Sequence, residues 1–188
     1  ETEVPRFSMD VYGQGLYPDQ QVFKYPKAGD PNAKVSLHMY DVASGKTAMV
    51  DLGAFDSYYI PRIKWSSDKN ILSVQLTGRK QNALDLVFVD ANDNKAVLIL
   101  KDTDDAYVDV TDNLTFLDDN SFIWTSEKDG WNQIYHYDKN GKLINQITKG
   151  DWEVTNYYGF DEGTSRIFYQ STEHGSINRD VYSIKTDG

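Results

Sequence analysis

Polar and apolar residues between Phe122 and Val154 follow an order that predicts strands separated by turns. Phe122 to Thr125 is aromatic and β-branched, and Gln133 to Tyr137 alternates polar and apolar side chains with a period of two. After the turn at Asp138-Lys139-Asn140-Gly141, Leu143 to Ile147 has the composition of a return strand. The Asn-Gly pair is typical of a type I′ turn, in which both central residues have positive φ. The segment therefore predicts three consecutive antiparallel strands.

The same pattern recurs along the chain at a nearly constant interval. An aromatic or aliphatic residue precedes a turn every 47 to 49 residues, at Tyr40, Val89, Tyr137 and Ile184. Repeats of about 40 to 50 residues with four strands each are typical of β-propeller blades. An antiparallel sandwich also has turns every 8 to 12 residues or so, but the near-constant spacing favours the propeller. We therefore predict an all-β fold, namely part of a β-propeller.

The repeats divide the chain into four parts of one propeller domain. We predict an incomplete blade over residues 1–58, whole blades over 59–112 and 113–150, and a second incomplete blade over 151–188. Glu1 to Tyr25 has no regular pattern and predicts an extended excursion rather than a strand pair. Phe55 to Tyr59 is expected to be a short aromatic connection. Because both terminal blades are incomplete, we expect the isolated chain to associate through their open edges or to be less stable than its parent domain.

Composition excludes several classes of partner. The 188 residues are 39% apolar and carry a net charge of −10 without a basic stripe, which argues against nucleic acid and against an anionic membrane surface. No run of 18 apolar residues indicates a membrane span. The absence of cysteine excludes disulfides and thiolate metal sites.

Two groups of residues raise the question of a metal. Five carboxylates lie between Asp102 and Asp112, and Ca²⁺ prefers oxygen ligands. This segment lacks the spacing, the glycine and the distal glutamate of an EF-hand, so a solvated loop between blades is the preferred interpretation, and the metal question stays open. The histidines His38, His136 and His174 occupy separate repeats without metal-ligand spacing. We therefore assign no metal-binding residue and expect no cofactor.

Several strings resemble one family in the same order. ETEVPRFSM, YPKAG, SEKDGWNQIYHYD and ITKGDWEV are similar to the N-terminal propeller of the dipeptidyl peptidase IV family of prolyl oligopeptidase-type serine peptidases. The resemblance implies a non-catalytic propeller segment of an enzyme that removes Xaa-Pro or Xaa-Ala dipeptides from a peptide substrate. The chain has no G-x-S-x-G motif, and the family's catalytic triad belongs to an α/β-hydrolase domain. The lack of cysteine points to a bacterial member, and the family to a periplasmic or extracellular location.

The resemblance also indicates candidate site residues. In the family, the loop matched by Ser126 to Asn132 faces the substrate cavity, and an aromatic residue and its neighbour help to line it. By position these residues are Trp131 and Asn132, although vertebrate members have a basic residue where Asn132 stands. Alternatively, Trp131 caps the hydrophobic layer of its blade. A different function, a stand-alone propeller that binds proteins or glycans, fits the repeats but leaves the YPKAG string unexplained.

Overall fold

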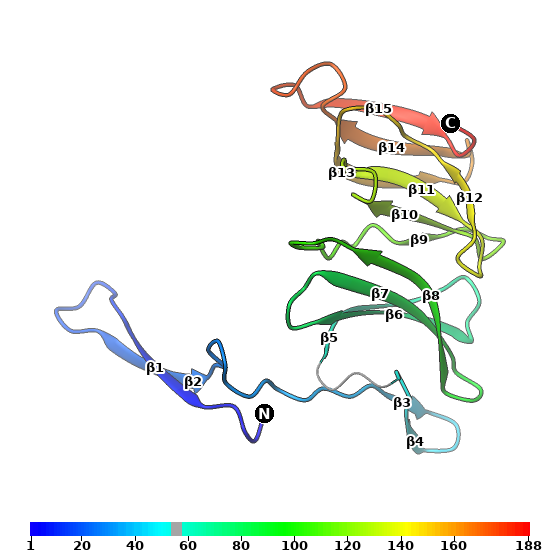
Figure 1. Cartoon of the computed structure of the whole chain (residues 1–188). Helices are drawn as coiled ribbons and strands as arrows, with labels where there is room; N and C mark the ends of the chain where they lie inside the picture. The colour runs from blue at the N-terminus through cyan, green and yellow to red at the C-terminus, as the bar shows by residue number, and fades with distance from the viewer. Residues whose placement is uncertain (54–57) are drawn as a thin grey trace.

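The computed structural model describes residues 1–53 and 58–188, whose regular secondary structure consists of β-strands in five antiparallel sheets. Three of these sheets stack on one another (Figure 1). We call them sheet I (β5–β8), sheet II (β9–β12) and sheet III (β13–β15). Their strands are β5 (Tyr58–Trp65), β6 (Ile71–Gly78), β7 (Ala83–Asp90), β8 (Lys95–Thr103), β9 (Thr115–Phe116), β10 (Phe122–Ser126), β11 (Gln133–Tyr137), β12 (Leu143–Gln146), β13 (Val154–Asp161), β14 (Arg166–Ser171) and β15 (Asp180–Lys185).

Sheet I is covered on both faces, and its two middle strands are buried along most of their length. Leu84, Leu86 and Phe88 of β7 pack toward sheet II, whereas Val87 and Val89 of the same strand belong to a second cluster on the opposite face. Successive side chains of a strand point to opposite faces, so β7 is buried from Leu84 to Val89. Continuous burial along the strand, rather than alternation of buried and exposed residues, therefore marks a strand that is covered on both sides.

Sheet II has the same arrangement and is the middle layer of the stack. In β10, Phe122 and Trp124 join the cluster shared with sheet I, and Ile123 joins the cluster shared with sheet III. The Phe122 ring lies 5.6 Å from that of Phe88 and stacks on that of Tyr137 at 5.5 Å. The side chains of β10 thus contribute to the hydrophobic contacts on both sides of sheet II.

The turn between β11 and β12 differs from the expected type I′ turn. Tyr137 pairs with Leu143 as the sequence predicts, but only Gly141 of the Asn-Gly pair has positive φ (82°), and the register shifts between His136 and Tyr137. The amide of Gly141 donates to the carbonyl of Asp138 at 3.0 Å. The left-handed residue is the last residue of this turn, and the strand register shifts beside it. These two features are typical of a hairpin loop longer than two residues, in which a glycine forms a β-bulge.

The first 50 residues contain two separate hairpins. β1 (Arg6–Val11) and β2 (Asp19–Lys24) pair over six residues each, so the predicted excursion over Glu1 to Tyr25 is wrong for this part of the chain. This hairpin extends away from the stacked sheets (Figure 1). Next, β3 (His38–Asp41) and β4 (Lys46–Met49) form a two-stranded sheet, and Val50 and Leu52 after it pack on sheet I.

The structure confirms the predicted all-β class. Sheets I and II have four strands each, and sheet III has three within the described residues. The division into blades at residues 58, 112 and 150 stays a prediction. Of the expected connection from Phe55 to Tyr59, residues 55–57 lie outside the described residues, and β5 begins at Tyr58.

Candidate functional site

The loop between β10 and β11 carries both predicted site residues, and glycine shapes it. Gly130 has a φ of 91° and donates its amide to the carbonyl of Glu127 at 2.7 Å. A residue without Cβ adopts this left-handed backbone without steric cost. The amide of Lys128 donates to the side-chain hydroxyl of Ser126 at 3.2 Å. Hydrogen bonds within the loop therefore close it before the chain reaches Trp131.

The structure places Trp131 and Asn132 in different surroundings. Trp131 is 42% exposed and belongs to none of the three core clusters formed by the described residues. The alternative that Trp131 caps the hydrophobic layer of its blade stays a prediction. Asn132 is partly buried, and its side-chain amide donates to the carbonyl of Val154 at 2.7 Å. A contact between either residue and a substrate stays a prediction.

A cavity of about 230 Å³ lies between this loop and the connection that follows β8. Its lining comes from Asp102 to Thr111 on one side and from Thr125 to Asn132 on the other. Asn132 is among the lining residues, whereas Trp131 is not. The cavity therefore adjoins one of the two predicted site residues.

Lys128 belongs to an aromatic cluster that the sequence analysis did not identify. Its ammonium group donates to the hydroxyl of Tyr137 at 2.8 Å and lies 3.8 Å from the centre of the Tyr135 ring. The Tyr135 hydroxyl donates to the carboxylate of Asp129 at 3.0 Å. Burial lowers the pKa of Lys128 and raises the pKa of Tyr137 to about 12. The available signal was the alternation of β11, which puts Tyr135 and Tyr137 on one face beside the turn.

Carboxylates give the cavity a negative character. The Asp102 carboxylate accepts a hydrogen bond from the indole of Trp124 at 2.8 Å. The Asp104 carboxylate accepts hydrogen bonds from the backbone amides of Ala106 and Tyr107. Burial raises the pKa of the Glu127 carboxyl, and the charges of Asp109, Glu153 and Asp104 raise it further. These contacts show that two of the carboxylates between Asp102 and Asp112 stabilise the local fold.

The structure does not bring the three histidines together. His38 contacts Ser36 at 3.0 Å, His136 contacts Ser121 at 2.8 Å and His174 contacts Asp180 at 3.2 Å, in three different sheets or their loops. Within residues 1–53 and 58–188, no three His, Asp or Glu side chains converge as a metal-ligand set. The same residues include no helix that is long and apolar enough to cross a membrane.

Comparison with known proteins identifies relatives over the whole chain. The family described as "Dipeptidyl peptidase IV (DPP IV) N-terminal region" matches residues 1–188. A protein of Aspergillus flavus named probable dipeptidyl peptidase 4 is 28% identical over 98% of this chain and 26% of its own length. Dipeptidyl peptidase 4 of Trichophyton equinum is 26% identical over the whole of this chain and 26% of its own length.

A crystal structure agrees with this relationship. Dipeptidyl peptidase 4 of Porphyromonas gingivalis superposes with a TM-score of 0.89 at 40% identity, over 99% of this chain and 27% of that one. The match confirms the predicted resemblance and the prediction that the sheets are part of a propeller. The chain thus spans about a quarter of the length of the relatives it matches. It belongs to the dipeptidyl peptidase IV N-terminal region family.

Proposed function

We propose that this chain is the non-catalytic propeller segment of a serine dipeptidyl peptidase that removes Xaa-Pro or Xaa-Ala dipeptides from peptide substrates. The observation that carries the proposal is the match of all 188 residues to the family, together with the 40% identity to the P. gingivalis enzyme. We assign the nucleophile and its base to an α/β-hydrolase domain of the full-length protein. The chain's own contribution is to line and gate the cavity that the substrate enters.

Trp131 and Asn132 are the residues that we assign to the substrate cavity. Exposed aromatic side chains on loops commonly contact ligands, and Trp131 is such a side chain. Asn132 presents a neutral side chain, so this position makes no ionic contact with the substrate. We place the protein in the periplasm or outside the cell, where peptide substrates of this kind are accessible.

Chromogenic hydrolysis tests the proposal directly. The full-length protein should release p-nitroaniline from a Gly-Pro substrate and lose this activity with a serine-directed reagent, because the reaction needs an activated serine. Residues 1–188 alone should release none. Turnover by the 188-residue chain would contradict the assignment of the chemistry to another domain. Ligand binding without turnover by the full-length protein would favour the alternative of a protein- or glycan-binding scaffold.

A further inference from the structure

Two neighbouring amide side chains connect the end of the Trp131 loop to the next sheet. The side-chain amide of Asn132 donates to the carbonyl of Val154 at 2.7 Å, and the backbone amide of Val154 donates to the carbonyl of Asn132 at 2.8 Å. Gln133, which is 1% exposed, donates its side-chain amide to the carbonyls of Trp152 at 2.6 Å and Gly150 at 3.2 Å. The loop of sheet II is therefore attached to the segment Gly150–Val154, which leads into β13 of sheet III.

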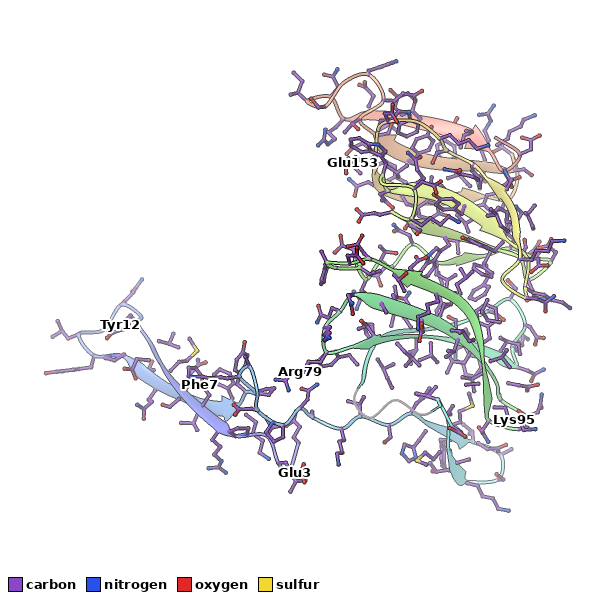
Figure 2. All side chains as sticks on the ribbon, viewed as in Figure 1. Glu3, Phe7, Tyr12, Arg79, Lys95 and Glu153 are labelled. Carbon is purple, nitrogen blue, oxygen red and sulfur yellow. The ribbon has the colours of Figure 1, made fainter. Side chains whose placement is uncertain are left out.

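This segment is itself held firmly by sheet III. Val154 is 2% exposed and belongs to the core between sheets II and III. The backbone carbonyl of Glu153 accepts a hydrogen bond from the backbone amide of Thr172, and the backbone amide of Glu153 donates to the Thr172 hydroxyl, both at 3.1 Å. The Trp152 ring stacks on that of Tyr169 at an interplanar angle of 8°. Figure 2 shows Glu153 beside sheet III. A loop tied to such a segment has little freedom to move independently of that sheet.

These contacts indicate that Trp131 and Asn132 have different roles. The amide nitrogen of Asn132 is engaged with Val154, so this group is not available as a donor to a substrate. Trp131, immediately before it, is 42% exposed. We infer that Asn132 and Gln133 are positioning residues that hold Trp131 in the orientation in which it contacts the substrate. This inference rests on the proposed function and assigns the direct contact to Trp131.

A double-mutant cycle in the full-length enzyme separates direct contact from positioning. Trp131→Ala should raise KM about tenfold for a substrate with a large N-terminal residue, such as Phe-Pro-p-nitroanilide, because it removes an aromatic contact. Asn132→Ala should raise this KM about three- to tenfold with kcat nearly unchanged, as expected for the loss of one hydrogen bond that orders the loop. In the Trp131→Ala background, Asn132→Ala should change KM by less than about twofold, since the group that it positions is gone.

Asn145 provides a matched control. Its side-chain amide donates to the carbonyl of Thr186 at 2.9 Å and so also joins sheet II to the end of sheet III. That contact lies beyond Lys185, at the end of sheet III opposite to Val154. Asn145→Ala should therefore leave KM unchanged even if it lowers the melting temperature. If Asn132→Ala fails to fold, Asn132→Asp retains the volume, replaces the donor by an oxygen and should raise KM similarly.

Each outcome decides a different point. If Trp131→Ala leaves KM unchanged for both Phe-Pro and Gly-Pro substrates, this loop does not line the substrate cavity, and the assignment under the proposed function fails. If Trp131→Ala raises KM and Asn132→Ala does not, the positioning role is overturned. If the effects of the two substitutions add, Asn132 contacts the substrate directly, which also overturns it.

Discussion

Single residues with positive φ determine how the hairpins turn. Gly45, Asn94 and Ser165 adopt φ values of 69°, 58° and 53° and immediately precede β4, β8 and β14. Gly and Asn tolerate this conformation better than other residues, so their places can be predicted from the sequence. Ser165 could not be predicted in this way, because serine has no comparable preference. The wrong type I′ assignment at Asn140 has a similar cause, since the dipeptide alone does not set the length of the loop.

Substitution of Gly141 should cost more than substitution of Gly45, the glycine in the turn between β3 and β4. A Cβ at this position would overlap the carbonyl group of Ile99 in β8, whereas a Cβ at Gly45 would meet nothing closer than the Tyr40 hydroxyl at 3.9 Å. Gly45→Ala should therefore lower the free energy of unfolding only because alanine is strained in the left-handed conformation, by about 1 kcal/mol. Gly141→Ala adds the overlap with sheet I and should cost about 3 kcal/mol. Urea denaturation of both variants measures the difference, and equal costs would contradict the predicted overlap.

His136 should make the stability of sheet II depend on pH. Burial lowers the pKa of His136, and the charge of Asp119 opposes this effect only in part. The unfolded chain therefore binds a proton more readily than the folded chain. The stabilisation is fully present above the ordinary pKa of 6.5 and is lost as the pH falls through the lower pKa of the folded state.

Thermal unfolding at about pH 7.5 and about pH 5.5 checks this expectation. The melting temperature of the unsubstituted chain should fall more between these two values than that of His136→Gln, which has no proton to gain. His38→Gln, in the exposed β3–β4 hairpin, is the control and should keep the full pH response. If the melting temperature of His136→Gln falls as much as that of the unsubstituted chain, His136 contributes nothing to the pH dependence of stability.

At the level of elements, strands with a covered face were predictable and the β1–β2 hairpin was not. Val89 and Tyr137 lie in or at the end of buried strands, where the apolar pattern reports the core. All six residues of β2 are exposed, so burial imposes no alternation on their sequence. The glycines between Val11 and Asp19 then suggested an irregular segment. Backbone pairing with β1, together with the ring contact of Phe7 and Phe23 at 5.9 Å, forms a hairpin that the hydrophobic pattern does not record.

The candidate site was predictable only as a loop. Turn residues at Asp129 and Gly130 between two strand patterns place Trp131 and Asn132 in the loop immediately before β11. The bonds from Asn132 and Gln133 to Gly150–Val154 join residues 17 to 22 positions apart, across two sheets. A strand period describes the faces of one sheet and contains no information on which backbone carbonyls of the next sheet lie opposite. The attachment of the loop therefore required the three-dimensional structure.

Arg79 should control the attachment of the β1–β2 hairpin. Its guanidinium donates to the carbonyls of Lys27, at 2.8 Å, and Asp30, in the segment that follows β2 (Figure 2). The Lys27 ammonium in turn lies 4.5 Å from the centre of the Phe7 ring. Arg79→Ala should speed amide exchange in residues 25–35 about two- to tenfold, as expected for the loss of one or two exposed hydrogen bonds. Exchange in the core of sheet I should not change.

Lys80→Ala is the control for this experiment. Lys80 follows Arg79 in the same turn and is also exposed. Its replacement by alanine should leave exchange in residues 25–35 unaltered. If both variants loosen that segment equally, the turn as a whole holds the hairpin, and the specific role of Arg79 is wrong.

For the whole molecule, stability should be concentrated in the middle of the stack. Sheet II shares a hydrophobic cluster with sheet I on one face and another with sheet III on the other. Sheet III packs on one described neighbour only, and β15 pairs with β14 alone. An edge strand presents unpaired backbone groups and readily pairs with another chain. The 64% exposure of Val181 in β15 adds apolar surface to this edge.

Hydrogen exchange of the isolated chain should follow this order. Amides of β6, β7, β10 and β11 should be the most protected, because their exchange requires the opening of sheets that are covered on both faces. Amides of β1 to β4 and of β15 should exchange much faster, since frayed edges open without disrupting a core. Because apolar edges remain, we also expect light scattering to show association that increases with concentration, which the net charge of −10 slows but does not prevent. A strict monomer with uniform protection from Lys34 to Lys185 would show instead that the 188 residues are a self-sufficient domain whose terminal sheets are as stable as its centre.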